Sequence, residues 1–209
     1  MAAMNPPIIK ALTISHPRAS RPVLGSPLAY DRAVPDSPEQ LDYVSFVDYA
    51  IDRVTAGGAA VDPVAMRLVL TLHRVTSALV YDVESGVHRP RGLSWPGFRV
   101  LFVLWLAGPL EAKRVAELSG MSRAAVSALV NTLERDGLVS RSRAEHDGRA
   151  VTLALTPGGI ESITDAYLAH NAREQVWASA LTGPEQRTLI GLLQKLMDGP
   201  AAESARRRT

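Results

Sequence analysis

One stretch, residues 110 to 156, constrains the fold of this chain more than any other part of it. It begins with the pattern of a short helix, in which Val115, Ala116 and Leu118 fall on one side. Gly120 follows where the chain must turn sharply, and glycine adopts the backbone conformations of such turns without steric cost. We therefore expect a helix, buried through these three side chains, that ends in a tight turn.

A second helix follows this turn directly. Ser122 is a favoured N-cap residue, and Gly137 is typical of the position just after a helix end. The apolar positions between them keep the spacing of a one-sided helix: Val126, Leu129, Val130 and Leu133. The stretch therefore predicts two consecutive helices joined by a turn of few residues.

A β-hairpin is predicted after the second helix. Val151, Leu153 and Leu155 alternate as in a half-buried strand. We pair that strand, across the loop 144–148, with a strand over residues 138–143. Helix, turn, helix and hairpin in this order make a winged helix-turn-helix, whose second helix is suited to the major groove of DNA.

Four motifs in this region resemble those of the MarR-type transcriptional regulators. They are Leu118–Arg123, Leu133–Val139, the wing triplet Asp147-Gly148-Arg149, and Leu155–Gly159. The resemblance covers roughly residues 64 to 197, and its specificity comes from the matched order and spacing of the motifs. It implies a homodimeric bacterial regulator, most often a repressor, that leaves a pseudo-palindromic operator in double-stranded DNA when a small, often aromatic, acid binds.

The remainder of the chain divides around this module. Residues 1–36 are rich in proline and read as an extended or disordered arm, and residues 37–92 as N-terminal dimerisation helices. Residues 93–157 form the winged helix-turn-helix, and residues 158–209 form C-terminal dimerisation helices with a basic tail. The expected fold is thus mostly α, with a small β-hairpin wing and dimerisation helices from both ends of the chain.

Two helices are predicted before the module. Ser37 and Pro38 are suited to a helix start, and an apolar stripe follows: Leu41, Val44, Val47, Ile51 and Val54. This helix is either an added dimerisation helix or a lid over the body. Asp62 and Pro63 predict a second, long helix to about Gly86. Its inward positions are expected to be Val69, Leu72, Thr76, Leu79 and Val83.

Three more helices are marked by their starts. Ser94, Thr156 and Thr182 each precede a helical pattern, and Thr182 forms a capping box with Glu185. The helix after Thr156 should run to about residue 180 with Ile160, Ile163 and Tyr167 inward, and the last helix has a leucine stripe: Leu189, Leu192, Leu193 and Leu196. A small winged domain cannot cover all these apolar faces, so we expect pairing across a twofold axis to bury the excess.

Residues for DNA binding are assigned on both the second helix and the wing. Ser122 and Arg123 stand at the helix start, where backbone N–H groups favour phosphate, while Ser127 and Asn131 can point at base edges. Asparagine suits adenine, and the surrounding alanines make strong guanine recognition unexpected. The wing candidates are Arg141, Arg143, Asp147 and Arg149. An arginine at such a tip can enter the minor groove, and the resemblance gives Arg149 that role.

An effector site is expected between the winged module and the dimerisation helices, on the analogy of the family. Its candidates are aromatic side chains for stacking and Arg99 for a carboxylate, together with a histidine: His73, Tyr81, Trp95, Arg99 and Trp105. Aromatic side chains at helical spacing also fit an ordinary core.

Motifs for catalysis are missing from the sequence: it has no HExxH, P-loop, GxGxxG or GxSxG. It has no cysteine, and its five histidines share no metal-ligand spacing, so we expect no enzyme, cofactor or metal site. No signal peptide is evident, and we expect a cytoplasmic protein without membrane contact. The alternatives are an activator, a low-specificity architectural DNA binder, or a winged-helix module that binds protein; steep salt dependence would favour DNA.

Overall fold

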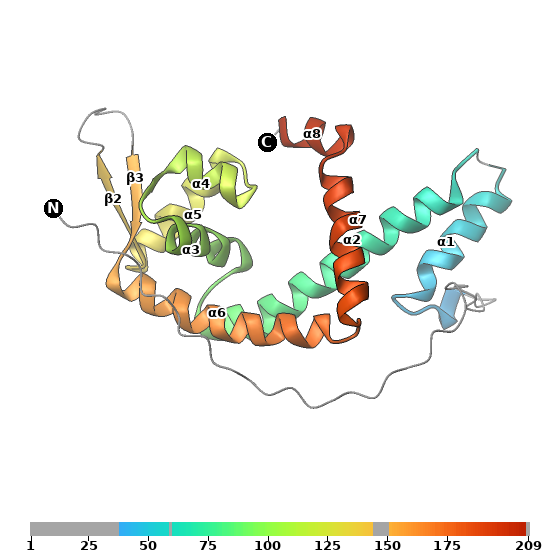
Figure 1. Cartoon of the computed structure of the whole chain (residues 1–209), viewed down its shortest axis with the longest axis horizontal. Helices are drawn as coiled ribbons and strands as arrows, with labels where there is room; N and C mark the ends of the chain where they lie inside the picture. Colours follow the sequence, from blue (N-terminus) through green and yellow to red (C-terminus); the bar gives the residue numbers. More distant parts are fainter. Residues whose placement is uncertain (1–37, 59, 144–150, 208–209) are drawn as a thin grey trace. The chain divides into compact units, whose positions relative to one another are not determined.

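The computed structural model describes residues 38–58, 60–143 and 151–207 (Figure 1). The chain separates into two compact units, Met1–Gly58 and Ala59–Thr209. The helices of the first unit are η1 (Pro38–Gln40) and α1 (Ser45–Ala56). Helices of the second unit that precede the sheet are α2 (Pro63–Val83), η2 (Glu84–His88), η3 (Arg89–Arg91) and α3 (Trp95–Ala107).

The other elements of the second unit make the winged module and its C-terminal flank. The module contains β1 (Leu110–Glu111), α4 (Ala112–Ser119), α5 (Arg123–Arg135), β2 (Val139–Arg143) and β3 (Val151–Leu155). The flank contains α6 (Pro157–Ala178), α7 (Gly183–Met197) and α8 (Pro200–Arg207). The predicted class, mostly α with a winged helix-turn-helix, is confirmed.

The predicted helix start is confirmed only in part: Pro38 begins the three-residue 3-10 helix η1, Ser37 lies outside the described residues, and the regular helix α1 begins at Ser45 and not here. The Asp42 carboxylate accepts hydrogen bonds from the backbone N–H groups of Val44 and Ser45, at 2.9 and 2.7 Å. This turn delays the helix, and Val44 is 44% exposed although it was expected inward. Val47 and Ile51 are buried as predicted.

Helix α2 begins as predicted but ends differently. Asp62 accepts from the N–H groups of Val64 and Ala65, and Pro63 occupies the first turn, which needs no N–H donor there. Instead of stopping near Gly86, the chain passes into the π-helix η2 and then the 3-10 helix η3. A π-helical turn is rare, and no residue pattern in this segment signals it.

Much of the apolar surface of α2 is exposed. Val83 is buried, but Leu72 and Leu79 are only partly buried, and the prediction that Val69 and Thr76 point inward is wrong. Val69 is 64% exposed. The apolar spacing is real, yet α2 extends beyond the winged module, so the elements of that module do not cover this part of the helix (Figure 1).

The sheet has the order β1-β3-β2 and is antiparallel throughout. The hairpin is confirmed, with Val139 opposite Leu155 and Arg143 opposite Val151. Strand β1 was not predicted, because two residues are too short to show an alternating pattern. It pairs Leu110 with Leu153, which puts the buried Leu153 in the central strand.

The core of the second unit lies between α3, α4, α5, the sheet and α6. Its fully buried side chains include Val100, Leu101, Val115, Val126 and Ile163. Two inward predictions are wrong: Leu118 on α4 is 48% exposed, and Ile160 on α6 is 50% exposed.

Two ion pairs join α2 and η3 to α6. Arg173 donates two hydrogen bonds to the Asp82 carboxylate, at 2.6 and 2.7 Å, and the Trp177 indole N–H donates a third at 2.7 Å. These bonds lower the pKa of Asp82 to about 2. Arg91 pairs with Asp165 at 2.6 Å. The long flanking helix α6 is therefore held near its middle, at Asp165, and in its second half, at Arg173, against the segment that precedes α3.

Candidate DNA-binding surface

The turn before α5 fixes the direction of that helix. Gly120 has φ 65°, a left-handed conformation that ends α4, and the Met121 N–H donates to the Ala116 carbonyl at 3.1 Å. The Ser122 hydroxyl then accepts from the Ala125 N–H at 3.2 Å, as the cap prediction required. Because this bond uses the oxygen only as an acceptor, the Ser122 hydroxyl hydrogen stays available to a phosphate.

Helix α5 presents two different faces. Val126, Val130 and Leu133 are buried against the core, while Leu129 is partly buried. The predicted contact residues Arg123, Ser127 and Asn131 are exposed on the other face. The other exposed side chains as far as Thr132 are small, and the longer Glu134 and Arg135 are exposed in the last turn: Ala124, Ala125, Ala128, Thr132, Glu134 and Arg135. Such a face lets a backbone approach DNA closely but offers few long side chains to it.

The wing residues are only partly described. Arg141 is exposed on β2, and its guanidinium group donates to the Asn131 side-chain oxygen and lies 3.3 Å from the Glu134 carboxylate. Arg143 belongs to β2 by its backbone. The predicted Asp147 and Arg149 lie outside the described residues, so their DNA contacts stay predictions.

Positive charge gathers at the helix-turn-helix turn. Lys113, Arg114 and Arg123 are exposed there, and Arg114 pairs with Glu117 at 2.8 Å. The Arg114 hydrogen bond is the main reason that the pKa of Glu117 is lowered, with the charges of Lys113 and Arg123 adding to it. Three cations against one carboxylate give this edge a positive field although the chain's formal net charge is only +2.

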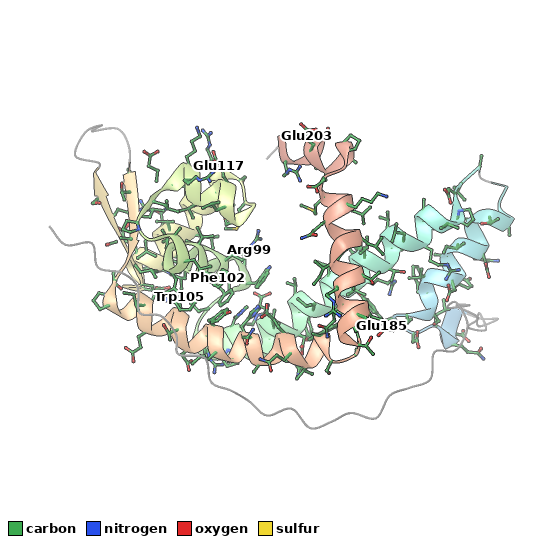
Figure 2. All side chains as sticks on the ribbon, in the orientation of Figure 1. Arg99, Phe102, Trp105, Glu117, Glu185 and Glu203 are labelled. Atoms are coloured by element: carbon green, nitrogen blue, oxygen red, sulfur yellow. The ribbon has the colours of Figure 1, made fainter. Side chains whose placement is uncertain are left out.

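A stack of aromatic rings joins the segment before α3 to α6. The His88 ring lies 4.4 Å from that of Phe98 and 5.6 Å from that of Trp95, with the planes close to parallel. The row continues from Phe102 to Tyr167, whose ring centroids are 5.5 Å apart. Figure 2 shows Phe102 and Trp105 on the part of α3 that adjoins α6.

The five effector candidates are not brought into one place. Trp95 and Arg99 are neighbours: the guanidinium carbon lies 5.9 Å from the indole ring, and Arg99 also donates to the Ser119 carbonyl. Trp105 packs on Tyr167 farther along the stack. His73 and Tyr81 are exposed on α2. An effector site at these residues stays a prediction, with Trp95 and Arg99 as its only candidates in mutual contact.

A buried histidine pair was missed by the sequence reasoning. His88 Nε2 lies 3.2 Å from His170 Nδ1, and His170 Nε2 lies 3.2 Å from the Glu174 carboxylate. With Glu174 accepting from His170, the His170 Nδ1 accepts from His88. The Nδ1 of His88 is then a buried acceptor without a partner among the described residues. The two histidines are 82 positions apart, and no local pattern could have paired them.

This pair predicts a pH-dependent stability. Burial, followed by the charge of His170, lowers the pKa of His88 from 6.5 to about 4. The unfolded chain therefore binds a proton at this residue before the folded chain does, and stability falls as pH drops from about 6.5 towards 4. We expect a loss on the order of 2–3 kcal/mol in the free energy of unfolding over this range.

Urea unfolding at pH 7 and at pH 4.5 measures this loss, with His88→Phe as the comparison. The phenyl ring keeps the stack but cannot titrate, so the variant should lose less stability on acidification than the parent. The Asp82 ion pair does not interfere, because a carboxyl whose pKa is lowered to about 2 loses its contribution only below this window. An equal acid loss in both proteins would contradict the assignment.

Comparisons with known proteins agree on one family. Residues 91–150 match the model of the MarR family. The HTH-type transcriptional regulator YwaE of Bacillus subtilis (strain 168) is 34% identical over 134 residues, which are 64% of this chain and 78% of that protein. MgrA of Staphylococcus aureus is 33% identical over 115 residues, 54% of this chain and 76% of that protein. The crystal structure of PcaV from Streptomyces coelicolor, in complex with its natural ligand, matches with a TM-score of 0.60 at 26% identity, over 68% of this chain and 98% of that one.

Proposed function

Because the chain belongs to the MarR family of HTH-type transcriptional regulators, we propose that it is a homodimeric repressor acting in the cytoplasm on a pseudo-palindromic operator. The observation that carries this proposal is the exposed face of α5, with Arg123, Ser127 and Asn131 projecting from a helix whose other face is buried. A helix held in this way can enter the major groove without losing its core contacts.

Dimerisation is proposed from the flanking helices. None of the residues of α7 is buried, and its apolar side chains are exposed: Leu189, Ile190, Leu192, Leu193, Leu196 and Met197. Helix α2 exposes Val64, Leu68 and Val69 as well. An apolar surface of this kind, distributed over two helices, is covered in a stable protein, and a second copy of the chain presents the matching surface.

The segment Pro63–Arg91 is also long and apolar enough, by length and composition alone, to cross a membrane. Helices that form an interface between subunits meet the same criterion. We propose the interface rather than a membrane, because the end of this segment is tied to α6 by the ion pairs Asp82–Arg173 and Arg91–Asp165. An ionised, hydrogen-bonded carboxylate such as Asp82 suits an aqueous boundary and not a bilayer interior.

Release from DNA is proposed to follow binding of a small aromatic acid. The relative PcaV was solved with its natural ligand, and it shares the fold over most of its length. In this chain Trp95 supplies a ring face and Arg99 a guanidinium beside it, the combination that holds an aromatic carboxylate. Arg99 also contacts α4 through the Ser119 carbonyl, so a ligand there would act on the helix that precedes the DNA-reading helix.

Selection of bound fragments from a library of random DNA duplexes tests the proposed function. A homodimer should enrich an inverted repeat whose half-sites lie one helical turn, roughly 34–36 Å, apart. Binding without an enriched sequence would favour an architectural role, and absence of binding would favour the protein-interaction alternative. Repression itself is tested by whether the enriched operator, placed upstream of a reporter, lowers transcription when the protein is present.

Arg123→Gln is expected to lower the affinity for every DNA sequence to a similar degree, by about tenfold. The reason is that an exposed arginine at a helix start binds phosphate and not a base. The salt dependence of binding should decrease by about one phosphate contact per subunit. Titrations of operator and random duplexes over a range of salt concentrations measure both effects.

Arg187→Gln removes the same charge from α7 and serves as the control, with an affinity expected to be near that of the parent. If Arg123→Gln retained the affinity and the salt slope of the parent, Arg123 would not be part of the interface.

A further inference from the structure

One side-chain network links the wing strand β2 to the exposed face of α5, the recognition helix of the proposed DNA-binding module. Arg141 on β2 donates from Nη2 to Asn131 Oδ1, and its Nε lies 3.3 Å from Glu134 Oε2. Both partners are on α5, three residues apart, and so on the same side of the helix. We propose that Arg141 and Glu134 are positioning residues that fix how Asn131 reads DNA.

The backbone around this network is well fixed. Arg141 is paired with the central strand, opposite Leu153, which is buried. On the helix, Val130 and Leu133 adjoin Asn131 and Glu134 in sequence and are buried in the core. The guanidinium group therefore reaches α5 from a strand that cannot shift without disturbing the core.

The chemistry of arginine decides the orientation of the Asn131 amide. A guanidinium group has only donors, so only the oxygen of the amide can face it. The Nδ2 amino group is then directed away from Arg141, and it has no hydrogen-bond partner among the described residues. Asn131 is exposed, and in this orientation its amino group offers DNA two donors, while its oxygen is turned towards Arg141.

This orientation changes the base that Asn131 is expected to prefer. Adenine is read by an asparagine whose oxygen accepts from N6 while its nitrogen donates to N7, and here the oxygen faces Arg141, which already uses one of its two lone pairs. Cytosine presents a donor in the major groove and is disfavoured for the same reason. Guanine N7 and O6 and thymine O4 are acceptors. The network thus selects guanine or thymine at the contacted position, although the amino-acid type alone suggested adenine.

Glu134 has the supporting role. Its carboxylate lies beside Nε of the guanidinium group, so Arg141 keeps one geometry between two acceptors on the helix. This inference rests on the proposed DNA binding, and it concerns the base preference of that site, not its overall affinity. A phosphate contact by Arg141 would change affinity for every sequence equally.

The test is selection from random duplexes with the full chain and four variants. Asn131→Ala removes the reading group, Arg141→Met removes the donors while keeping a long side chain, and the double variant combines them. Arg135→Met is the matched control, because it removes an arginine of α5 that pairs with Asp136 and forms no hydrogen bond with Asn131.

We expect the parent and Arg135→Met to prefer guanine or thymine at one position per half-site, by about tenfold over adenine. Asn131→Ala should flatten that position. Arg141→Met should free the Asn131 amide to rotate, and the base preference at this position should then move towards adenine. The double variant should match Asn131→Ala, because Arg141 acts on base choice only through Asn131.

Other results would overturn the proposal in distinguishable ways. A parent that prefers adenine, or an Arg141→Met variant that loses affinity but keeps the parent's base preference, would leave DNA binding intact and refute the positioning role. An unchanged preference in Asn131→Ala would remove Asn131 from base reading. A parent that enriches no duplex at all would refute the proposed function, and the positioning role with it.

Discussion

Replacing Gly159 with alanine is expected to destabilise the protein by about 3 kcal/mol or more. A Cβ atom at this position would lie 2.0 Å from the carbonyl oxygen of Leu138 and 3.3 Å from a methyl group of Leu155. That oxygen cannot move away freely, because it accepts the N–H of Thr156 at 3.1 Å. A clash between fixed backbone atoms is relieved only by separating α6 from the end of the recognition helix, which costs more than ordinary overpacking.

Gly158→Ala is the matched control for this prediction. Its Cβ would meet nothing closer than 3.8 Å, and an alanine in the first turn of α6 reduces the entropy of the unfolded chain. We expect this variant to be as stable as the parent or slightly more stable. Urea unfolding of the three proteins measures the difference, and a Gly159→Ala variant within 1 kcal/mol of the parent, roughly the error of such comparisons, would contradict the packing described here.

Replacing Leu192 with aspartate is expected to separate the proposed dimer. Leu192 is 57% exposed in the single chain and lies on the apolar stripe of α7. In a dimer joined through this stripe, two unpaired carboxylates would be buried, at a cost of several kcal/mol. Every 1.4 kcal/mol is tenfold in affinity, so dimerisation should weaken by roughly 100-fold or more.

Operator binding should fall with dimerisation, because a monomer contacts only one half-site. Light scattering at micromolar concentration measures the mass, and titration of an operator duplex measures the affinity. Gln194→Asp adds the same charge on the other side of the same exposed helix and should leave both unchanged. A Leu192→Asp protein that remains dimeric would show that this stripe is not the interface.

Local signals predicted the starts of the helices well. Asp62, Ser94, Ser122 and Thr156 each accept a backbone N–H at the start of a helix, and Thr182 forms its capping box with Glu185. Gly120 and Gly137 adopt positive φ where the turns were expected. These features depend on residues within four positions of one another, so the sequence contains all that they need.

The spacing of apolar residues predicted which helix faces are apolar, but it did not predict which of those faces are buried. Val126, Val130 and Leu133 are buried as expected, while Val69 on α2 and Ile160 on α6 have the same kind of spacing and remain exposed. The difference arises because burial depends on whether another element lies over the face. Periodicity carries no information about that neighbour.

Contacts between distant residues were decided by the tertiary structure alone. His88 meets His170 because the π-helical turn directs it into the aromatic stack, and Asp82 meets Arg173 across 91 positions. Asn131 and Arg141 were each assigned to DNA from the sequence, but their mutual hydrogen bond depends on how the hairpin folds back on α5. The sequence thus determined the helices, the turn and the chemical types on the reading face. The folded chain decided how one of those side chains is oriented, because a side chain's free donors and acceptors are those its neighbours leave unoccupied.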